Sequence, residues 1–554
     1  MKILKREVSP DKNNAQREYR SNMTAYAGIV AYIICLGLRI PLCRIIGDEG
    51  VGLFAPAFEI FTLITLLFSQ GISKTLTGML RYRIKREQYK SAGRIFDVAF
   101  KLSLFISVIA AVVLVLASGI ISTTLVLEPM SKKAVMAVAP ALILASLVNV
   151  FRGYFNGNGF GVLVVHSQYI EKIAMFIMAI FGGRLMYDYG LKVSDLLKQE
   201  TPAYAYAALG VMLGIMISEL VTLIYLLLVF ALYSGTRRKQ LAQDGTRRVE
   251  NSEEVMRSIL SNSLPFALLV IVYNSFMLID QRFFNYCINR MVPGEPRAAL
   301  WGAYYGKVAV LIGICSALVC LTLYGHIGKI VSAHEKEEYR MMRDRIGGAV
   351  KTLCIFAIPI SVFMAVMADA FVNGIYRGEN ETAISLVRQG CIIIFFYAAA
   401  YLFGQIMLKI HMVKEFLISL AISFVLHIAA LFLMLKVSLM GAEGIIYSVI
   451  IFTGVLAVSC FVFITRTFKY RQDWLYSVLF PALSACVAGL LVMLLKKLLL
   501  PLAGNLLTLL VSAIIAVVLY ILLLMILRVI SEAELSRLPL SNLWISIGRM
   551  IGVM

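Results

Sequence analysis

The feature that most constrains this chain is a series of long, nearly uninterrupted apolar runs. Residues 23–46, 104–126 and 506–527 are three of them. Each is close to the roughly 20 residues that a helix needs to cross the hydrocarbon core of a bilayer. Only helices and closed barrels cross this core, because backbone N–H and C=O groups need internal partners there. Since the runs are continuous rather than alternating, they predict an all-α polytopic membrane protein.

The composition agrees with a chain that lies mostly in the membrane. Hydrophobic residues make up 60% of the 554 positions, whereas soluble domains are about half apolar. The hydropathy pattern predicts about fourteen transmembrane helices. Their expected ranges are 23–46, 52–80, 96–118, 134–155, 164–186, 203–233, 259–281, 300–325, 348–372, 385–409, 415–437, 442–466, 473–495 and 504–530.

Basic residues are concentrated in alternate loops between these helices. The formal net charge is +20, and six basic residues precede Thr24, whereas the loop 47–50 has none. Four further basic loops fall on the same side as the N-terminal segment: 81–90, 236–257, 336–351 and 466–471. Lys496 and Lys497 fall on the opposite side and weaken the predicted placement of the last helical hairpin. The positive-inside rule therefore predicts a multi-pass cell-membrane protein with both termini in the cytoplasm. The excess charge indicates contact with anionic membrane lipids rather than with nucleic acid.

No pattern for a cofactor, a metal or a catalytic group is evident. The nine cysteines are spread singly without a C-x-x-C pair, and the five histidines lack ligand spacing. The stretch Gly302-Ala-Tyr-Tyr-Gly306-Lys307 is one residue too short for a Walker A loop and lies in a predicted helix. The sequence therefore predicts no cofactor, no metal and no ATP-driven pump. No loop is large enough for a catalytic domain, so an enzyme is not predicted.

A short internal repeat predicts how the helices are grouped. Glu87, Tyr89 and Lys101 precede or enter one apolar run, and Glu337, Tyr339 and Lys351 recur with the same Tyr-to-Lys spacing before another. Parallel repeats of six helices are typical of transporters. The predicted organisation is a basic cytoplasmic tail (1–22), an N-terminal six-helix bundle (23–233), a cytoplasmic linker (234–258), a C-terminal six-helix bundle (259–466), and helices thirteen and fourteen with a cytoplasmic tail (467–554).

Ionisable residues inside the predicted helices are the candidates for function. A charge at the bilayer centre costs at least about 2.5–3.5 kcal/mol, so it should face water, a partner or a substrate. Arg39 lies well inside the first helix, where Pro41 can kink the chain and turn the guanidinium inward; the alternative is snorkelling to the outer surface. Glu59 could pair with Arg39 or be hydrated near the outer end. Lys307 is either a functional cation of the eighth helix or a snorkelling one.

Two more ionisable residues lie in the N-terminal half. Arg152 ends the fourth helix near the cytoplasm, where snorkelling to anionic lipid is the simpler interpretation. Glu219 is buried by its position in the sixth helix, and the sequence does not identify its partner.

Several motifs resemble a known family. Arg39-Ile-Pro-Leu-Cys-Arg44-Ile-Ile-Gly47-Asp-Glu-Gly50-Val-Gly-Leu-Phe54 resembles the first-helix signature of the stage V sporulation protein B group, which belongs with the MurJ-type lipid II flippases in the multidrug/oligosaccharidyl-lipid/polysaccharide exporter superfamily. Phe151-Arg152-Gly-Tyr-Phe-Asn-Gly157 is similar to the fourth-helix motif of that group, and Ser167-Gln-Tyr-Ile-Glu171 to the start of its fifth helix. The likeness extends from the first helix to about the twelfth.

The resemblance implies an architecture and a set of binding residues. It implies two six-helix bundles around a central cavity, with helices thirteen and fourteen forming a groove through which lipid enters. Arginines of the first and eighth helices line the cavity in MurJ-type flippases, and Arg39 and Lys307 fall on or next to these positions. The candidate substrate-binding residues are therefore Arg39, Lys307, Glu59 and Arg152, with no catalytic residue.

Departures from the family pattern leave the substrate open. Gly71-Ile72-Ser73 stands where the family commonly has Gly-Ile-Pro, and the second-helix arginine of MurJ proper has no match. The resemblance implies a monomeric flippase that exports an undecaprenyl-diphosphate-linked sugar, either lipid II or a related polysaccharide unit, by alternating access, with H⁺ or Na⁺ as the alternatives for a coupling ion. The competing functions are a multidrug/cation antiporter of the same superfamily and a membrane-bound transferase.

Overall fold

The computed structural model describes residues 26, 28–198, 201–245, 250–291, 297–376, 381–530, 532, 544–546 and 549. The predicted basic tail, residues 1–22, lies outside this part of the chain. A helical segment at residues 28–37 comes first, and the chain is divided into two compact units, 1–306 and 307–554.

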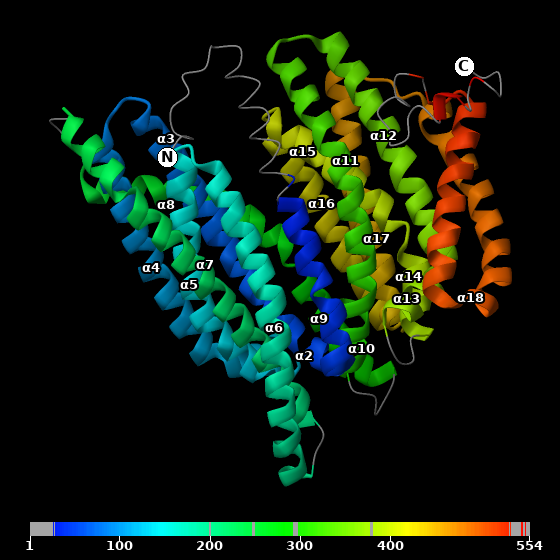
Figure 1. The fold of residues 1–554 in the computed structure, drawn as a ribbon, viewed down its shortest axis with the longest axis horizontal. Helices are drawn as coiled ribbons and strands as arrows, with labels where there is room; N and C mark the ends of the chain where they lie inside the picture. Colours follow the sequence, from blue (N-terminus) through cyan, green and yellow to red (C-terminus); the bar gives the residue numbers. More distant parts are fainter. Residues whose placement is uncertain are drawn as a thin grey trace. The chain divides into compact units, whose positions relative to one another are not determined.

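Unit 1 consists of helices and short helical turns (Figure 1). They are α2 (Arg39–Leu66), η1 (Leu67–Ser73), α3 (Lys74–Ile84), α4 (Tyr89–Ile120), η2 (Ile121–Leu125), η3 (Pro129–Ser131), α5 (Lys132–Gly157), α6 (Gly161–Leu197), α7 (Thr201–Gln243), α8 (Ser252–Asn274), α9 (Phe276–Met291) and α10 (Arg297–Ala303). A π-helical turn, η4 (Tyr304–Val308), spans the boundary between the two units.

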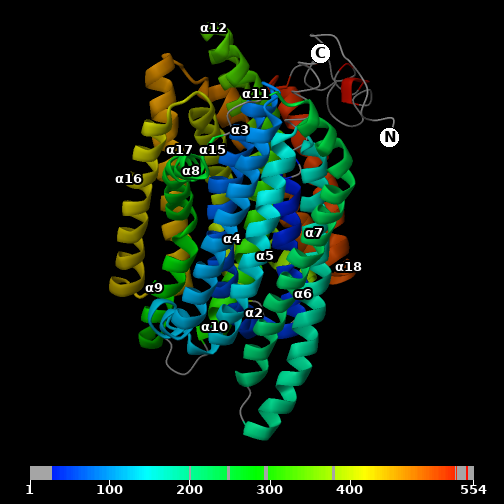
Figure 2. The ribbon, with the colours of Figure 1, turned by 90° about the vertical axis from the view of Figure 1, so that its left-hand side faces the viewer.

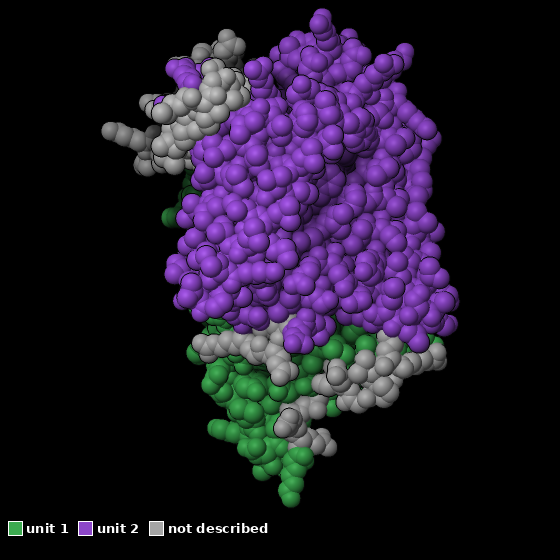
Figure 3. Space-filling model, turned by 90° about the vertical axis from the view of Figure 1, so that its right-hand side faces the viewer, with its two compact units in different colours: residues 1–306 green, residues 307–554 purple. Residues whose placement is uncertain are grey.

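Unit 2, which Figure 3 shows from the side of α18, is also helical. It contains α11 (Ala309–Glu335), α12 (Tyr339–Val366), α13 (Ala368–Ile375), α14 (Glu381–Gly390), α15 (Ile393–Lys409), α16 (Val413–Leu431), η5 (Phe432–Val437), α17 (Ala442–Phe468), η6 (Leu475–Leu479) and α18 (Phe480–Ile526). Every element in the described ranges is a helix or helical turn (Figures 1 and 2), so the predicted all-α membrane fold is confirmed.

The outer surfaces of the helices are apolar and the contacts between helices are small and polar. On α4, the side chains of Phe105 and Leu116 are 65% and 79% exposed, whereas Ser103 and Ser107 are fully buried. A protein in water would bury the large apolar side chains. In a bilayer these side chains face hydrocarbon, and small residues let neighbouring helices approach closely. The distribution is that of helices surrounded by lipid.

Ten helices in the described ranges, or eleven with one bent pair, are long and apolar enough to cross a membrane. Two of them, Gly28–Ile84 and Leu475–Ile526, have 57 and 52 residues, more than twice the roughly 20 that one crossing needs. Each bends at a glycine with positive φ, Gly47 at 69° and Gly504 at 70°, a conformation that glycine adopts without steric cost. The predicted turns between helices one and two and between thirteen and fourteen fall at these glycines, and Figure 1 shows α18 folding back. The total of about fourteen stays a prediction.

Lys496, which the charge pattern placed on the side with few basic residues, has a partner within unit 2. Its Nζ lies 2.6 Å from Asp369 Oδ1 and donates a hydrogen bond to the Val366 carbonyl at 3.0 Å. Asp369 is on α13, so this ion pair ties α13 to the first arm of α18.

The two copies of the internal repeat have the same local structure in their respective units. Glu87 and Glu337 both adopt a left-handed conformation, with φ of 57° and 59°. The N–H of Glu87 bonds to the Ile84 carbonyl at 3.0 Å, and that of Glu337 bonds to the His334 carbonyl at 3.0 Å. In each case the next long helix begins two residues later, at Tyr89 or Tyr339. The sequence repeat therefore corresponds to a repeated helix–turn–helix connection.

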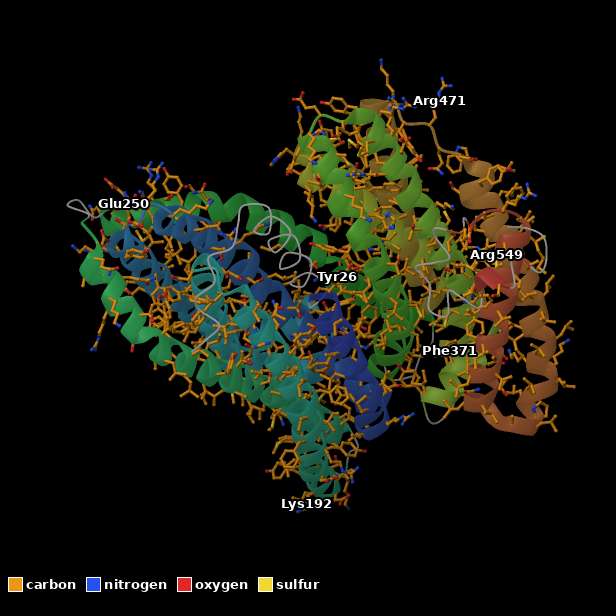
Figure 4. The ribbon with its side chains drawn as sticks, turned by 45° about the horizontal axis from the view of Figure 1, so that its top comes forward. Tyr26, Lys192, Glu250, Phe371, Arg471 and Arg549 are labelled. Atoms are coloured by element: carbon orange, nitrogen blue, oxygen red, sulfur yellow. The ribbon has the colours of Figure 1, made fainter. Side chains whose placement is uncertain are left out.

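The predicted linker 234–258 lies within unit 1. Helix α7 continues through its first part to Gln243, and α8 begins at Ser252. Helices α6 and α7 extend beyond the other helices of unit 1 as a long hairpin (Figures 1 and 2). Lys192, near the tip of this hairpin, and Glu250, in the linker, lie at opposite ends of unit 1 (Figure 4). The predicted division into two six-helix bundles stays a prediction.

Membrane orientation can be tested by cysteine labelling in a cysteine-free background. Gly50, in the predicted outer loop, is buried, so a label there would not react. Lys192 and Gln243 are exposed and lie in segments that the positive-inside rule assigns to opposite sides. We expect Lys192→Cys to react with an impermeant maleimide added to intact cells, and Gln243→Cys to react only after permeabilisation. Reaction of Gln243→Cys in intact cells would reverse the orientation.

Candidate functional site

Arg39 lies where the first helix is interrupted. The helical segment 28–37 ends before Leu38, and α2 begins at Arg39. Pro41 has no backbone N–H to donate to the Gly37 carbonyl, so a regular helix cannot run through this turn. Leu38 nevertheless keeps helical dihedrals, with φ of −56° and ψ of −34°, so the predicted kink at Pro41 stays a prediction.

The Arg39 guanidinium is held by Tyr305 and Glu59. Nη2 donates to the Tyr305 hydroxyl at 2.6 Å, and Nη1 donates to the Tyr305 carbonyl at 3.3 Å. The guanidinium carbon lies 3.6 Å from the centroid of the Tyr305 ring, within the range of a cation–π contact. Glu59 Oε1 accepts a bond from the Tyr305 hydroxyl at 2.6 Å and lies 3.5 Å from Arg39 Nη2. Arg39 is only 6% exposed, so it pairs with Glu59 and does not snorkel.

Tyr305 is positioned by close packing of α10 against α2. A Cβ added to Gly302 would lie 1.8 Å from the Asp48 carbonyl oxygen, and one added to Gly52 would lie 1.8 Å from the Ala298 carbonyl oxygen. Only glycine allows the two backbones to touch at these points. The π-helical turn η4 follows α10 directly and carries Tyr305. Short π-helical turns are frequent at functional sites, and this one supplies the ring that covers Arg39.

Lys307 occupies the same π-helical turn but belongs to unit 2. Its side chain is 4% exposed, so the snorkelling alternative is wrong. Its Nζ lies 5.9 Å from the centroid of the Tyr376 ring at the end of α13, which is close to the limit of a cation–π contact. Lys307 is therefore a buried cation, and its role in substrate binding stays a prediction.

Arg152 forms part of a second group of charges in unit 1. Its Nε donates to the Ser167 hydroxyl at 2.9 Å, and its Nη2 lies 2.6 Å from Glu171 Oε2, a contact that has the distance but not the angle of a hydrogen bond. Lys172 Nζ contacts the other oxygen of the Glu171 carboxylate. Arg152 is 9% exposed, so snorkelling to lipid is the wrong interpretation. The Arg152 side chain turns inward because the Glu171 carboxylate of α6 lies beside the end of α5.

Unit 2 contains a groove of about 800 Å³ between α12 and both arms of α18. Most of its lining is apolar, with Pro359, Val492 and Tyr520 among the side chains. At one end it is lined by His326, Lys329, Arg345 and Thr352. This end belongs to the α11–α12 connection, which the charge pattern assigns to the cytoplasmic side. The groove combines a long apolar wall with a cationic end.

Sequence reasoning missed Tyr305 and Lys172 as members of these charged groups. Tyr305 was considered only within a rejected nucleotide motif, although two tyrosines beside Lys307 in an apolar helix were an available signal. Glu171 and Lys172 are adjacent charges inside a predicted transmembrane helix. Their cost in the bilayer indicated partners on a neighbouring helix.

Comparison with known proteins gives a consistent family and fold. A model of the polysaccharide biosynthesis protein family matches residues 21–331. The stage V sporulation protein B of Bacillus subtilis (strain 168) is 20% identical over 375 residues, which cover 67% of this chain and 69% of that protein.

Two groups of solved structures share the fold. The lipid II flippase MurJ in an inward closed conformation aligns with a TM-score of 0.63 and 13% identity over 91% of this chain and 98% of that one. An inward-facing multidrug resistance MATE family transporter of the MOP superfamily aligns with a TM-score of 0.59 and 14% identity over 80% and 94%. At these identities the alignments establish a common fold and not a common substrate.

Proposed function

Because this chain belongs to the polysaccharide biosynthesis protein family, we propose that it is a flippase that exports an undecaprenyl-diphosphate-linked sugar across the cytoplasmic membrane by alternating access. The cargo is lipid II or a related polysaccharide unit. The observation that carries this proposal is the buried Arg39 guanidinium, stacked on Tyr305 inside a membrane helix. Ionisable groups inside membrane helices are rare and mark the pathways of substrates and ions, and a guanidinium suits an anionic substrate.

The chemistry of Arg39 suits a diphosphate. A guanidinium carries five N–H donors in a plane and binds phosphate through two parallel hydrogen bonds. In the described conformation its charge is balanced by Glu59, 3.5 Å away. A diphosphate must therefore take the place of Glu59, with the Tyr305 hydroxyl free to turn from the carboxylate to the new anion. This exchange makes substrate binding compete with an internal ion pair.

The remaining candidate residues have different parts in the proposal. Lys307 supplies a second buried cation for the anionic head group. Arg152 stays a predicted substrate-binding residue, although its guanidinium is engaged by Glu171 and Ser167 in the described conformation. A multidrug antiporter would require these cations to accept cationic drugs, which they repel.

The groove in unit 2 provides a place for the lipid tail. We propose that the polyprenyl chain lies along its apolar wall between α12 and α18 while the head group moves through the protein. The Lys329 and Arg345 side chains at one end of the groove would meet the diphosphate as it arrives from the inner leaflet. Keeping the tail in an apolar groove leaves only the polar head to be transferred out of water.

The proposal is tested by reconstitution in liposomes with three labelled lipids: lipid II, a teichoic acid precursor and a neutral polyprenyl-linked sugar. We expect outward flipping of one or both diphosphates and not of the neutral lipid. An inside-negative potential favours export of an anion by roughly 2.3 kcal/mol per charge and 100 mV, so clamping the potential at zero should slow export. Equal transport of the neutral lipid, or efflux of a cationic dye that survives Arg39→Ala and Lys307→Ala, would contradict the proposal.

A further inference from the structure

We propose that four side chains in the interior of unit 1, Arg152, Glu171, Lys172 and Glu219, form a proton-binding site that couples transport to a pH gradient, with the Glu219 carboxyl carrying the proton. The inference rests on the proposed transport function. The four residues come from three neighbouring helices: Arg152 from α5, Glu171 and Lys172 from α6, and Glu219 from α7.

The packing of α6 against α7 places Glu219 beside the other three. A Cβ added to Gly182 would lie 2.4 Å from the Gly210 carbonyl oxygen, and one added to Gly214 would lie 2.2 Å from the Met178 carbonyl oxygen. The two backbones are therefore in contact and run antiparallel. Following this register one turn further along α7 brings Glu219 opposite the turn of α6 that holds Lys172.

Glu219 is the carboxyl of this group that lacks a direct partner. It is 3% exposed, and within the described part of the chain it makes no hydrogen bond or ion pair. It lies within electrostatic range of Glu171, Lys172 and Arg152. Both cations, however, contact the Glu171 carboxylate. Burial and the negative charge of Glu171 both disfavour the ionised form of Glu219. A proton bound to Glu219 removes the negative charge of its carboxylate.

The surroundings favour a proton over a metal cation. A sodium or calcium ion prefers several oxygen ligands, whereas here a guanidinium and an ammonium stand beside the carboxyl and would repel it. No group of three or more potential metal-ligating side chains exists among the residues that the structure describes. A proton is held covalently by one carboxyl oxygen, so it needs no such cage. Lys172, whose side chain is 24% exposed, gives the group one point of contact with the surface.

The neighbouring charges are balanced only when Glu219 is ionised. Within the group, Arg152 and Lys172 carry two positive charges, and Glu171 and ionised Glu219 carry two negative charges. Protonation of Glu219 leaves two positive charges and one negative charge, a net charge of +1. Cys35, before α2, is a further titratable group near this set and lies within electrostatic range of Lys172, Arg39, Glu171 and Glu59. Tyr305 and Tyr32 lie within electrostatic range of Arg39.

The direction of coupling follows from the conformation described. Arg39 is paired with Glu59 and Tyr305 here, and in the same conformation Arg152 and Lys172 both contact Glu171. A diphosphate would have to displace the Arg39–Glu59 pair, so we assign the proton to the carrier in which this pair is intact, which is the form that returns without substrate. An inside-negative potential pulls this positive form inward, so proton entry and anion export are driven in the same sense.

The coupling is tested with Glu219→Gln in proteoliposomes carrying labelled lipid II and the labelled teichoic acid precursor, with the potential clamped at zero. We expect external acid to speed export by the wild-type protein at least several-fold, and to have no effect on Glu219→Gln. The matched control is Glu128→Gln. Glu128 lies between η2 and η3, burial raises the pKa of its carboxyl while Arg297 lowers it, and its replacement should leave the response to acid intact. A response of Glu219→Gln equal to that of the wild type would overturn the coupling.

A second measurement does not depend on the substrate. The infrared carbonyl band of a protonated carboxylic acid should be present in the purified protein, decrease on alkaline titration and lose intensity in Glu219→Gln. Glu219→Leu removes the carboxyl without introducing an amide. It should lose the same intensity from the carboxylic acid band, which would show that the change in Glu219→Gln does not arise from the new amide group. An unchanged band in both variants would overturn the proton site even if transport is found. A band difference without any lipid transport would instead retain the proton site and contradict the proposed function.

Discussion

Replacing Arg39 by alanine should reduce flipping of the diphosphate-linked lipid on the order of a hundredfold or more, while the protein still inserts. Hydrogen bonds to charged groups contribute about 1.5–3 kcal/mol each, and a diphosphate would lose two of them. The variant also leaves Glu59 as a carboxylate without its cation, which places an uncompensated negative charge where the anion must bind. The loss of hydrogen bonds and the repulsion by Glu59 therefore both weaken binding of the diphosphate. Rates of flipping in proteoliposomes, normalised to the amount of inserted protein, measure the effect.

Arg39→Lys separates charge from geometry. An ammonium keeps the positive charge but binds phosphate as a point charge rather than through a planar fork, so flipping should fall only roughly tenfold, as expected for the loss of one such bond. The matched control is Arg184→Ala, since Arg184 is an arginine of the same unit that is 61% exposed and pairs with Asp188 at 3.2 Å. It should flip lipid at the wild-type rate. Normal flipping by Arg39→Ala at normal insertion would show that the buried guanidinium has only a structural role.

The sequence was sufficient to predict the fold class because the bilayer imposes a simple rule on it. Helix length and apolar composition follow directly from the thickness of the hydrocarbon core, so most predicted helices fall on helices of the structure, even where Gly47 and Gly504 join two of them. The predicted helices 259–281, 348–372 and 385–409 each run across a break, between α8 and α9, α12 and α13, and α14 and α15. The repeat at Glu87 and Glu337 was predictable for a similar reason, because a turn of fixed conformation needs fixed spacing.

The partners of the charged residues were not predictable in the same way. Arg39 and Tyr305 are separated by 266 positions, and no periodicity of either helix indicates that they meet. The prediction that Arg39 pairs with Glu59 is confirmed because the two residues lie on consecutive helices joined at Gly47, where few arrangements are available.

Arg152 shows why position along a helix is an insufficient guide. A cation near a helix end can reach the head groups, and this favoured snorkelling. Which way the side chain turns depends on the neighbouring helix, and α6 offers both the Ser167 hydroxyl and the Glu171 carboxylate. A direct ion pair then replaces contact with lipid. The same information about neighbours was needed to place Lys172 and Glu219.

Glu171→Gln should destabilise the protein strongly, because it removes the carboxylate that both Arg152 and Lys172 contact. Breaking a buried ion pair by removing one partner costs about 3–5 kcal/mol, since an unpaired charge is left behind. Replacing both partners with apolar residues of similar size, as in Arg152→Met with Glu171→Leu, should restore much of the loss. The apparent Tm in detergent, compared at one scan rate because unfolding of such proteins is often irreversible, measures both effects.

Asp188→Asn is the matched control for this prediction. It breaks an ion pair of the same helix, Arg184–Asp188, whose side chains are 61% and 50% exposed, and such exposed pairs contribute about 0–1 kcal/mol. If Asp188→Asn and Glu171→Gln lower the apparent Tm equally, the Arg152 group does not stabilise unit 1.

The double variant that combines Glu171→Gln with Glu219→Gln adds a further test. In Glu171→Gln alone, Glu219 can release its proton and neutralise one of the two cations. Removing both carboxyls should therefore lower the apparent Tm by more than the sum of the single changes, whereas additive losses would mean that Glu219 does not interact with these cations.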